Sequence, residues 1–208
     1  AYEQMKLAAA GLDALPRADR RVAFILGALQ VLDEDLRARG GALIVRHGVA
    51  AEEIPRLAAE LAVQAVFTNH DDEPQALQRD ARVAARLEGL GVAWRSFKDH
   101  VIFERRELMT AAGGPYGVFT PYKNAWLRRV DEFYLSSYPV ERHTAALAGH
   151  GLARGVPTLQ DIGFEPVGLT PHLGQGSRGA AALLDDFLDR MDEYDRRRDF
   201  PALKGPSY

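Results

Sequence analysis

The chain has 208 residues, of which 47 % are apolar, and its formal net charge at pH 7 is −3. This length allows one large domain or one domain plus part of another, and the weak charge excludes a global field that would draw the chain onto nucleic acid or an anionic membrane. The absence of cysteine excludes disulfides, thiolate zinc sites and thiol nucleophiles. No apolar run could span a bilayer and no signal peptide opens the sequence, so we expect a cytoplasmic protein with no membrane partner.

Helix-like and strand-like patterns alternate over the first two thirds of the chain. Apolar residues at helical spacing predict helices over 22–36, 54–61 and 77–87. Short apolar runs between turn residues predict strands over 42–46, 65–68 and 92–97. This order indicates the α/β class, with a Rossmann-like, doubly wound parallel sheet. Residues 1–15 are helix-like, so we expect the first strand of such a sheet to be missing.

The loops after the predicted strands are the places where a sheet of this type binds ligands. They comprise residues 46–48, 69–73 and 98–100. No G-x-G-x-x-G motif or P-loop follows a strand, which argues against a standard dinucleotide or triphosphate site. The second loop gathers one histidine and three carboxylates, and we favour a solvated helix start over a metal site there.

No side chain stands out as a nucleophile or a general base. The six histidines show neither H-x-x-x-H nor H-E-x-x-H spacing, and no G-x-S-x-G elbow is present. We therefore predict no catalytic side chain and no metal site.

The last third of the chain changes character. Residues 115–134 begin as a loop and continue as a helix with an aromatic side. We favour core packing over ligand stacking for its rings, Tyr116, Phe119, Tyr122 and Trp126. The Pro- and Gly-rich run that follows predicts a long connection, and a new helix begins near Gly179. We expect an α/β domain over 1–134, an interdomain linker over 135–178 and the start of an all-α domain over 179–208.

Arginines and carboxylates alternate near the end of the chain, where Arg196, Arg197 and Arg198 stand between aspartates. Taken alone, this pattern favours a salt-bridged surface over a phosphate site. Composition and spacing thus lead only to a soluble cytosolic α/β domain with an extra helical segment.

Two blocks carry a resemblance to a known family. The pattern Y-x-x-x-R-D-F-P-A-x-x-G-P-S over 194–207 resembles the start of the flavin-binding helical domain of the DNA photolyase/cryptochrome family. The block V-F-T-P-Y-K-N-A-W over 118–126 is similar to that of bacterial cyclobutane pyrimidine dimer photolyases. The resemblance covers about residues 12–208.

The resemblance implies that the full-length protein is a deoxyribodipyrimidine photolyase, a carbon–carbon lyase acting on UV-damaged DNA. Such enzymes split pyrimidine dimers by electron transfer from excited reduced FAD. Tyr194 and Ser207 then correspond to FAD-binding positions. Arg198 corresponds to a DNA-binding position, where a guanidinium suits a phosphate. The rest of the flavin site would follow Tyr208, so we expect this chain to be inactive alone, and monomeric.

The family also uses an antenna pigment near its α/β domain. Folate-binding relatives carry an Asn-Glu pair after the loop that corresponds to 69–74, and this chain has Gln75 and Ala76 there. The lost carboxylate argues against folate in that mode. It leaves another pterin, a deazaflavin or no antenna as the alternatives.

Two further functions stay open. The first is a cryptochrome-like blue-light photosensor, because the residues that separate it from a photolyase would lie downstream. The second is a free-standing α/β module that binds a nucleotide or a protein.

Overall fold

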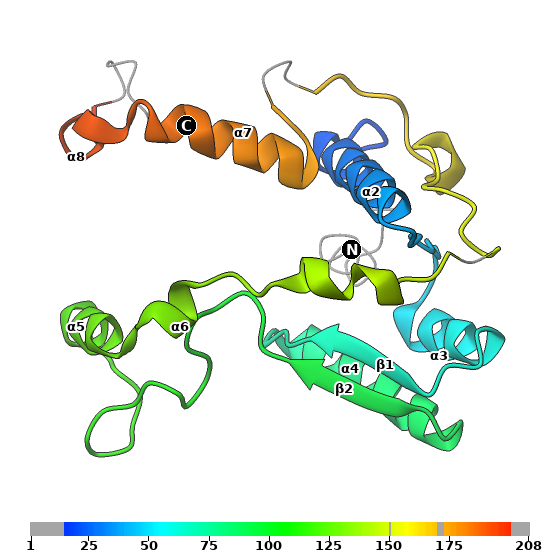
Figure 1. Cartoon of the computed structure of the whole chain (residues 1–208), viewed down its shortest axis with the longest axis horizontal. Helices are drawn as coiled ribbons and strands as arrows, with labels where there is room; N and C mark the ends of the chain where they lie inside the picture. Colours follow the sequence, from blue (N-terminus) through cyan, green and yellow to red (C-terminus); the bar gives the residue numbers. More distant parts are fainter. Residues whose placement is uncertain (1–14, 150, 170–172, 201–208) are drawn as a thin grey trace. The chain divides into compact units, whose positions relative to one another are not determined.

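The computed structural model describes residues 15–149, 151–169 and 173–200. Within these residues the chain forms two compact units. Unit 1 combines the described parts of 1–47 and 141–208, and unit 2 comprises residues 48–140 (Figure 1). The domain boundaries at 134 and 178 stay a prediction. No helix in the described part of the chain has both the length and the apolarity needed to cross a membrane.

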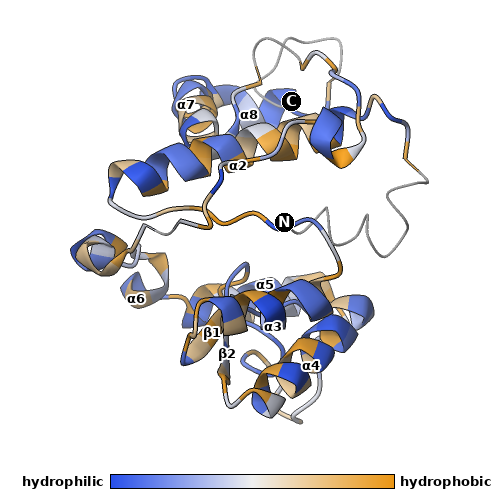
Figure 2. Ribbon diagram, turned by 90° about the vertical axis from the view of Figure 1, so that its right-hand side faces the viewer, coloured by the Kyte–Doolittle hydropathy of each residue, from blue (hydrophilic) through white to orange (hydrophobic). Residues whose placement is uncertain are grey.

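Unit 2 contains a parallel sheet with helices on one face. Its first elements in chain order are α3 (Ala50–Glu60), β1 (Ala65–Asn69), α4 (Pro74–Gly89) and β2 (Ala93–Phe97). The two strands pair in parallel from Ala65↔Ala93 to Asn69↔Phe97. Both helices pack on the face that carries Val66 and Trp94, and Figure 2 shows apolar and polar residues alternating around α4. The buried core consists of Ala51, Ala58, Val83, Leu87 and Val92.

A proline inside α3 explains how α3 and α4 are joined. Pro55 is buried and has no N–H, so the carbonyl of Ala51 one turn earlier has no helical donor. Arg86 of α4 fills this gap, because its Nη1 donates to the Ala51 carbonyl at 2.8 Å. One guanidinium thus satisfies a backbone acceptor and connects the two helices.

After β2, unit 2 continues through a long irregular segment to two further helices, α5 (Phe119–Arg129) and α6 (Glu132–Leu135). The sequence predicted one aromatic helix here, and that prediction is wrong at Val130. Val130 is extended, with a ψ of 131°. The Asp131 side chain then caps a new helix by accepting from the N–H of Phe133 at 3.0 Å.

Unit 1 is built around α2 (Arg20–Ala38). Val22 and Leu26 of this helix form a core with Ile162 and Phe164 from the Pro- and Gly-rich connection. The helix α7 (Gly176–Leu188) also packs on α2. The remaining elements are η2 (Val140–Ala146), η3 (Gln160–Ile162), α7 (Gly176–Leu188), η4 (Met191–Glu193) and α8 (Tyr194–Arg197).

The strand predicted over 42–46 is not present. These residues run without a β-ladder, and the sheet in the described residues consists of β1 and β2. The N–H of Leu43 donates instead to Asp33 Oδ1 at 3.1 Å, so a side chain of α2 replaces a neighbouring strand as the acceptor. The α/β class, the parallel pairing and the other two strands are confirmed.

Candidate functional site

Polar side chains gather where β1 and β2 end, at the edge of the sheet where ligands were expected. His70 follows β1 and Lys98 follows β2, and the irregular segment 99–118 brings two glutamates to them. His70 Nδ1 lies 2.7 Å from Glu104 Oε1. Lys98 Nζ lies 2.7 Å from Glu107 Oε2. We call His70, Lys98, Glu104 and Glu107 the strand-end cluster.

Lys98 and Glu107 of this cluster stabilise each other in the charged form. The hydrogen bond that Lys98 donates to Glu107 is the main cause that raises the pKa of Lys98. Conversely, the hydrogen bond from Lys98 is the main cause that lowers the pKa of Glu107, and the backbone N–H of Glu104 adds to it. Lys98 also donates to the Ile102 carbonyl at 2.9 Å. The cluster therefore fixes the path of the chain just after β2.

An aromatic layer adjoins the cluster. Phe103 is only 8 % exposed, and its ring meets Trp126 and Tyr134 edge-on, with centroid distances of 5.8 and 4.8 Å. The Arg129 guanidinium lies 5.4 Å from the centre of the Phe103 ring and donates to the Glu107 carbonyl. The core role predicted for Trp126 is confirmed. The same prediction is wrong for Phe119, the first residue of α5, which is 72 % exposed.

The arrangement at the strand ends orders the chain through an ion pair and a local hydrogen bond. Arg105 pairs with Asp72 at 2.8 Å, and Asp71 accepts from the N–H of Glu73 at 3.1 Å. Among the described residues, no three His, Asp or Glu side chains come together as metal ligands would.

The second candidate region is the turn at α8. Tyr194 opens this helix, and its ring meets Phe187 of α7 edge-on at 5.5 Å. The Arg198 guanidinium lies 5.7 Å from the centre of the Tyr194 ring. Arg198 Nε is 3.5 Å from Asp199, and the two side chains are 52 % and 76 % exposed. One helical turn thus presents an aromatic ring together with an exposed, weakly paired cation.

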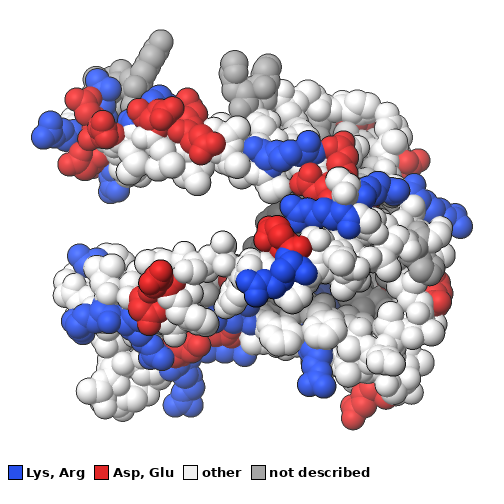
Figure 3. All heavy atoms as spheres, in the orientation of Figure 1, with Lys and Arg blue, Asp and Glu red and all other residues white. Residues whose placement is uncertain are grey.

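Charges of both signs interleave along α7 and α8 (Figure 3). Arg190 pairs with Asp186 at 2.5 Å, and Arg197 pairs with Glu193 at 2.8 Å. The salt-bridged surface predicted for Arg196, Arg197 and Arg198 is therefore confirmed for Arg197.

The antenna positions lie in the first turn of α4. Gln75 is exposed, whereas Ala76 is only 5 % exposed. Ser207, the other FAD position expected by resemblance, lies outside the described residues.

Sequence reasoning did not single out Glu104, Glu107 or Arg129. They sit in or beside an irregular segment without periodicity, so no pattern marked them. A partial signal was available, since Lys98 stands at a predicted strand end and needs an acceptor once the strand is half-buried.

Comparison with known proteins gives consistent results. A family model with the description "DNA photolyase" matches residues 7–142. The deoxyribodipyrimidine photo-lyase of Halobacterium salinarum is 38 % identical over 184 residues, which make up 87 % of this chain and 38 % of that protein. Cryptochrome-2 of Gallus gallus is 28 % identical over 84 % of this chain and 32 % of its own length.

A solved structure agrees with these matches. A bacterial class III photolyase from Agrobacterium tumefaciens superimposes with a TM-score of 0.71 at 27 % identity, over 88 % of this chain and 38 % of that one. The chain spans about two fifths of the length of the curated photo-lyases it matches first.

Proposed function

Because the chain belongs to the DNA photolyase family, we propose that it acts in light-dependent DNA repair, as part of a deoxyribodipyrimidine photolyase. The observation that carries this proposal is the 38 % identity with the Halobacterium salinarum photo-lyase over 87 % of the chain. The reaction would be the splitting of UV-induced pyrimidine dimers.

The α8 turn suits such a role. FAD, when bound and reduced, would supply the light-driven electron to the dimer. Tyr194 offers a ring for contact with this cofactor, and its ring is held in place by Phe187. Arg198 is exposed and only loosely paired with Asp199, so its guanidinium is free to meet a DNA phosphate. We expect the protein to work as a monomer in the cytoplasm.

The antenna position argues for a pigment other than folate in the Asn-Glu mode. Ala76 is buried and carries no acceptor, and Gln75 is neutral. We propose that any antenna is a deazaflavin or a pterin held differently. Absorption spectra of the chain after incubation with a deazaflavin and with a folate test this. A folate that is retained by the chain and lost on Gln75→Ala would contradict it, because the pterin would then be held at the position of the Asn-Glu pair.

A chimera tests the repair function. The matching region of the Halobacterium salinarum photo-lyase is replaced by this chain, and the chimera is expressed in a photolyase-deficient bacterium. We expect survival after UV irradiation to rise in blue light and not in the dark. Arg198→Ala should reduce this rescue, whereas Arg197→Ala, which removes a cation already paired with Glu193, serves as the matched control. A folded, flavin-loaded chimera without light-dependent rescue would overturn the proposal.

The similarity to Cryptochrome-2 of Gallus gallus favours one second candidate, a blue-light photosensor. A photosensor would change its binding to a protein in the light and would repair nothing. A flavin-loaded chimera that responds to light but leaves pyrimidine dimers intact would favour this alternative.

A further inference from the structure

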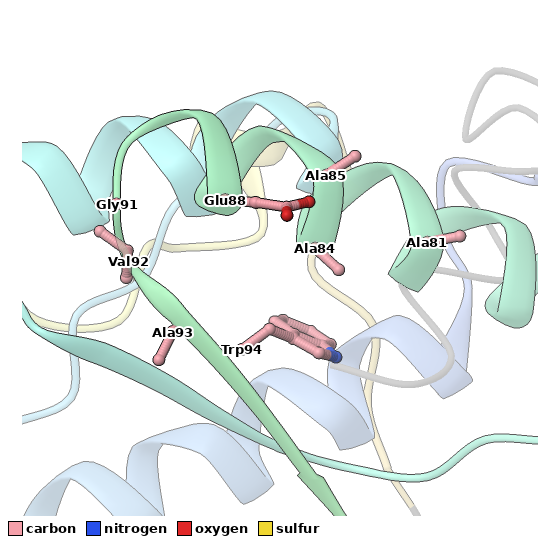
Figure 4. A pocket seen from close by; sticks show the side chains of 8 residues that line it. All are labelled: Ala81, Ala84, Ala85, Glu88, Gly91, Val92, Ala93 and Trp94. Carbon is pink, nitrogen blue, oxygen red and sulfur yellow. The ribbon is translucent and has the colours of Figure 1, made fainter.

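A groove of about 590 Å³ lies between α4 and the start of β2 (Figure 4). Three alanines of α4 form one wall, and the indole of Trp94 forms part of the floor. Ala81, Ala84 and Ala85 lie on one side of α4, because residues three and four apart share a helix face. Glu88 is the next residue on that face, and among the described residues it is the only charged one that lines the groove.

The groove runs along the free edge of β2. The Ala93 N–H donates to the Gln64 carbonyl, and the Phe97 carbonyl accepts from His70, so both residues turn their backbone groups toward β1. Backbone groups alternate in direction along a strand, so Trp94 and Ser96 turn theirs to the other edge. In the described residues β2 pairs with β1 alone.

We propose that this groove and the β2 edge form a docking site for an extended segment of a partner protein. The segment would pair with the backbone of Trp94 and Ser96, as in other cases of strand addition. Its side chains would alternate between two faces. Those on the α4 side would place an apolar group on Trp94 and a lysine or arginine beside Glu88.

Three observations support this occupant. The alanine wall leaves a space that larger side chains of α4 would have filled. Tryptophan is a residue type that often carries the binding energy of an interface. Glu88 gives the groove a negative charge, which a basic side chain complements. This site goes beyond the proposed repair reaction, because it lies at the opposite end of β2 from the strand-end cluster.

A second copy of this chain fits the edge less well than a partner segment does. If two copies paired symmetrically around Arg95, the two Arg95 side chains would face each other. Like charges directly opposite in a sheet are destabilising. The two Glu88 carboxylates would also carry the same sign.

The test uses the full chain and short blocked peptides of alternating valine and threonine, with either lysine or glutamate at both ends. We expect the lysine peptide to slow hydrogen exchange of the Trp94 and Ser96 amides. The glutamate peptide should bind about tenfold more weakly, and Glu88→Lys should reverse this preference, a difference of about 1.4 kcal/mol.

Two further variants distinguish peptide binding in the groove from nonspecific binding to the protein surface. Ala85→Arg fills the groove at an exposed position and should abolish binding, whereas Gln78→Arg, on exposed α4 surface outside the groove, should leave it unchanged. Absence of amide protection at Trp94 and Ser96 with every peptide would overturn the proposal. So would binding that ignores both Ala85→Arg and Glu88→Lys, or self-association of the chain through β2.

Discussion

Both the strand-end cluster and the α8 turn place cationic or basic side chains next to carboxylates, but the pairing has a different consequence in each region. In the cluster, Lys98 and His70 are each held by a glutamate at 2.7 Å, and the Glu104 side chain is only 11 % exposed. At α8, Arg198 is 3.5 Å from its partner Asp199, and the Asp199 side chain is 76 % exposed. Close pairing with partial burial orders a long irregular segment. Loose pairing in solvent contributes little to stability and leaves the cation available to a ligand.

The largest expected effect comes from the aromatic layer beside the cluster. Phe103→Ala removes a buried ring between Trp126 and Tyr134 and should lower the free energy of unfolding of unit 2 by about 3–5 kcal/mol. Both tryptophans of the chain, Trp94 and Trp126, lie in unit 2, so urea unfolding followed by tryptophan fluorescence reports on this unit.

The α8 side of the comparison provides the control. Phe187→Ala removes the ring that contacts Tyr194, in unit 1, and should leave the fluorescence transition of unit 2 unchanged. If Phe103→Ala shifted that transition no more than Phe187→Ala does, the aromatic layer would not be what holds the segment after β2.

Arg86 should have the next largest effect. Arg86→Met leaves the Ala51 carbonyl without a donor and should cost about 2 kcal/mol, the penalty of an unsatisfied buried acceptor. Pro55→Ala restores a helical N–H to that carbonyl, so adding it to Arg86→Met should recover much of the loss. Arg82→Met, at an exposed position of the same helix, is the matched control. A double variant as unstable as Arg86→Met would show that Arg86 acts in another way.

These contacts show which parts of the fold can be predicted from the sequence and which cannot. Periodicity located α2, α3, α4, β1 and β2, because each buries one apolar face or run. It failed at 42–46, since an apolar run predicts burial but not a pairing partner, and Leu43 bonds to Asp33 instead. It also failed at Val130, where the local cap of Asp131 outweighs the apolar spacing.

The candidate sites could be predicted only in part, and family resemblance rather than periodicity located the residues that were found. Tyr194 and Arg198 were found by resemblance, because their block is distinctive as a sequence. The strand-end cluster depends on contacts such as Lys98 to Glu107, which join residues of a segment without periodicity. Only the folded path of that segment shows which carboxylate meets which cation.

Asp33 extends the comparison to a buried carboxylate of unit 1. The hydrogen bond from Arg37 is the main cause that lowers its pKa below the ordinary 3.8. A carboxylate with a lowered folded pKa stabilises the fold fully above its unfolded pKa. This contribution is lost as the pH falls from about 3.8 through the folded pKa.

Asp33→Asn should therefore destabilise unit 1 by about 1 kcal/mol at neutral pH, because the amide oxygen still accepts from Leu43 while the charge facing Arg37 is lost. Helical circular dichroism during urea unfolding at pH 7 and below pH 3.8 measures this difference. The variant should converge with the unaltered chain in acid. A gap that stays constant with pH would mean that the charge of Asp33 contributes nothing.

Arg198 should have the smallest effect on stability and the clearest effect on function. Arg198→Ala removes a side chain that is 52 % exposed and loosely paired, so the free energy of unfolding should change by about 0.5 kcal/mol or less. In the photo-lyase chimera, the same change should weaken binding to UV-irradiated DNA and lower the salt slope of that binding by about 1. Arg197→Ala, which breaks the Glu193 pair, should leave the salt slope nearly unchanged. Equal slopes for the two variants would mean that loose pairing at α8 does not select the cation that meets DNA.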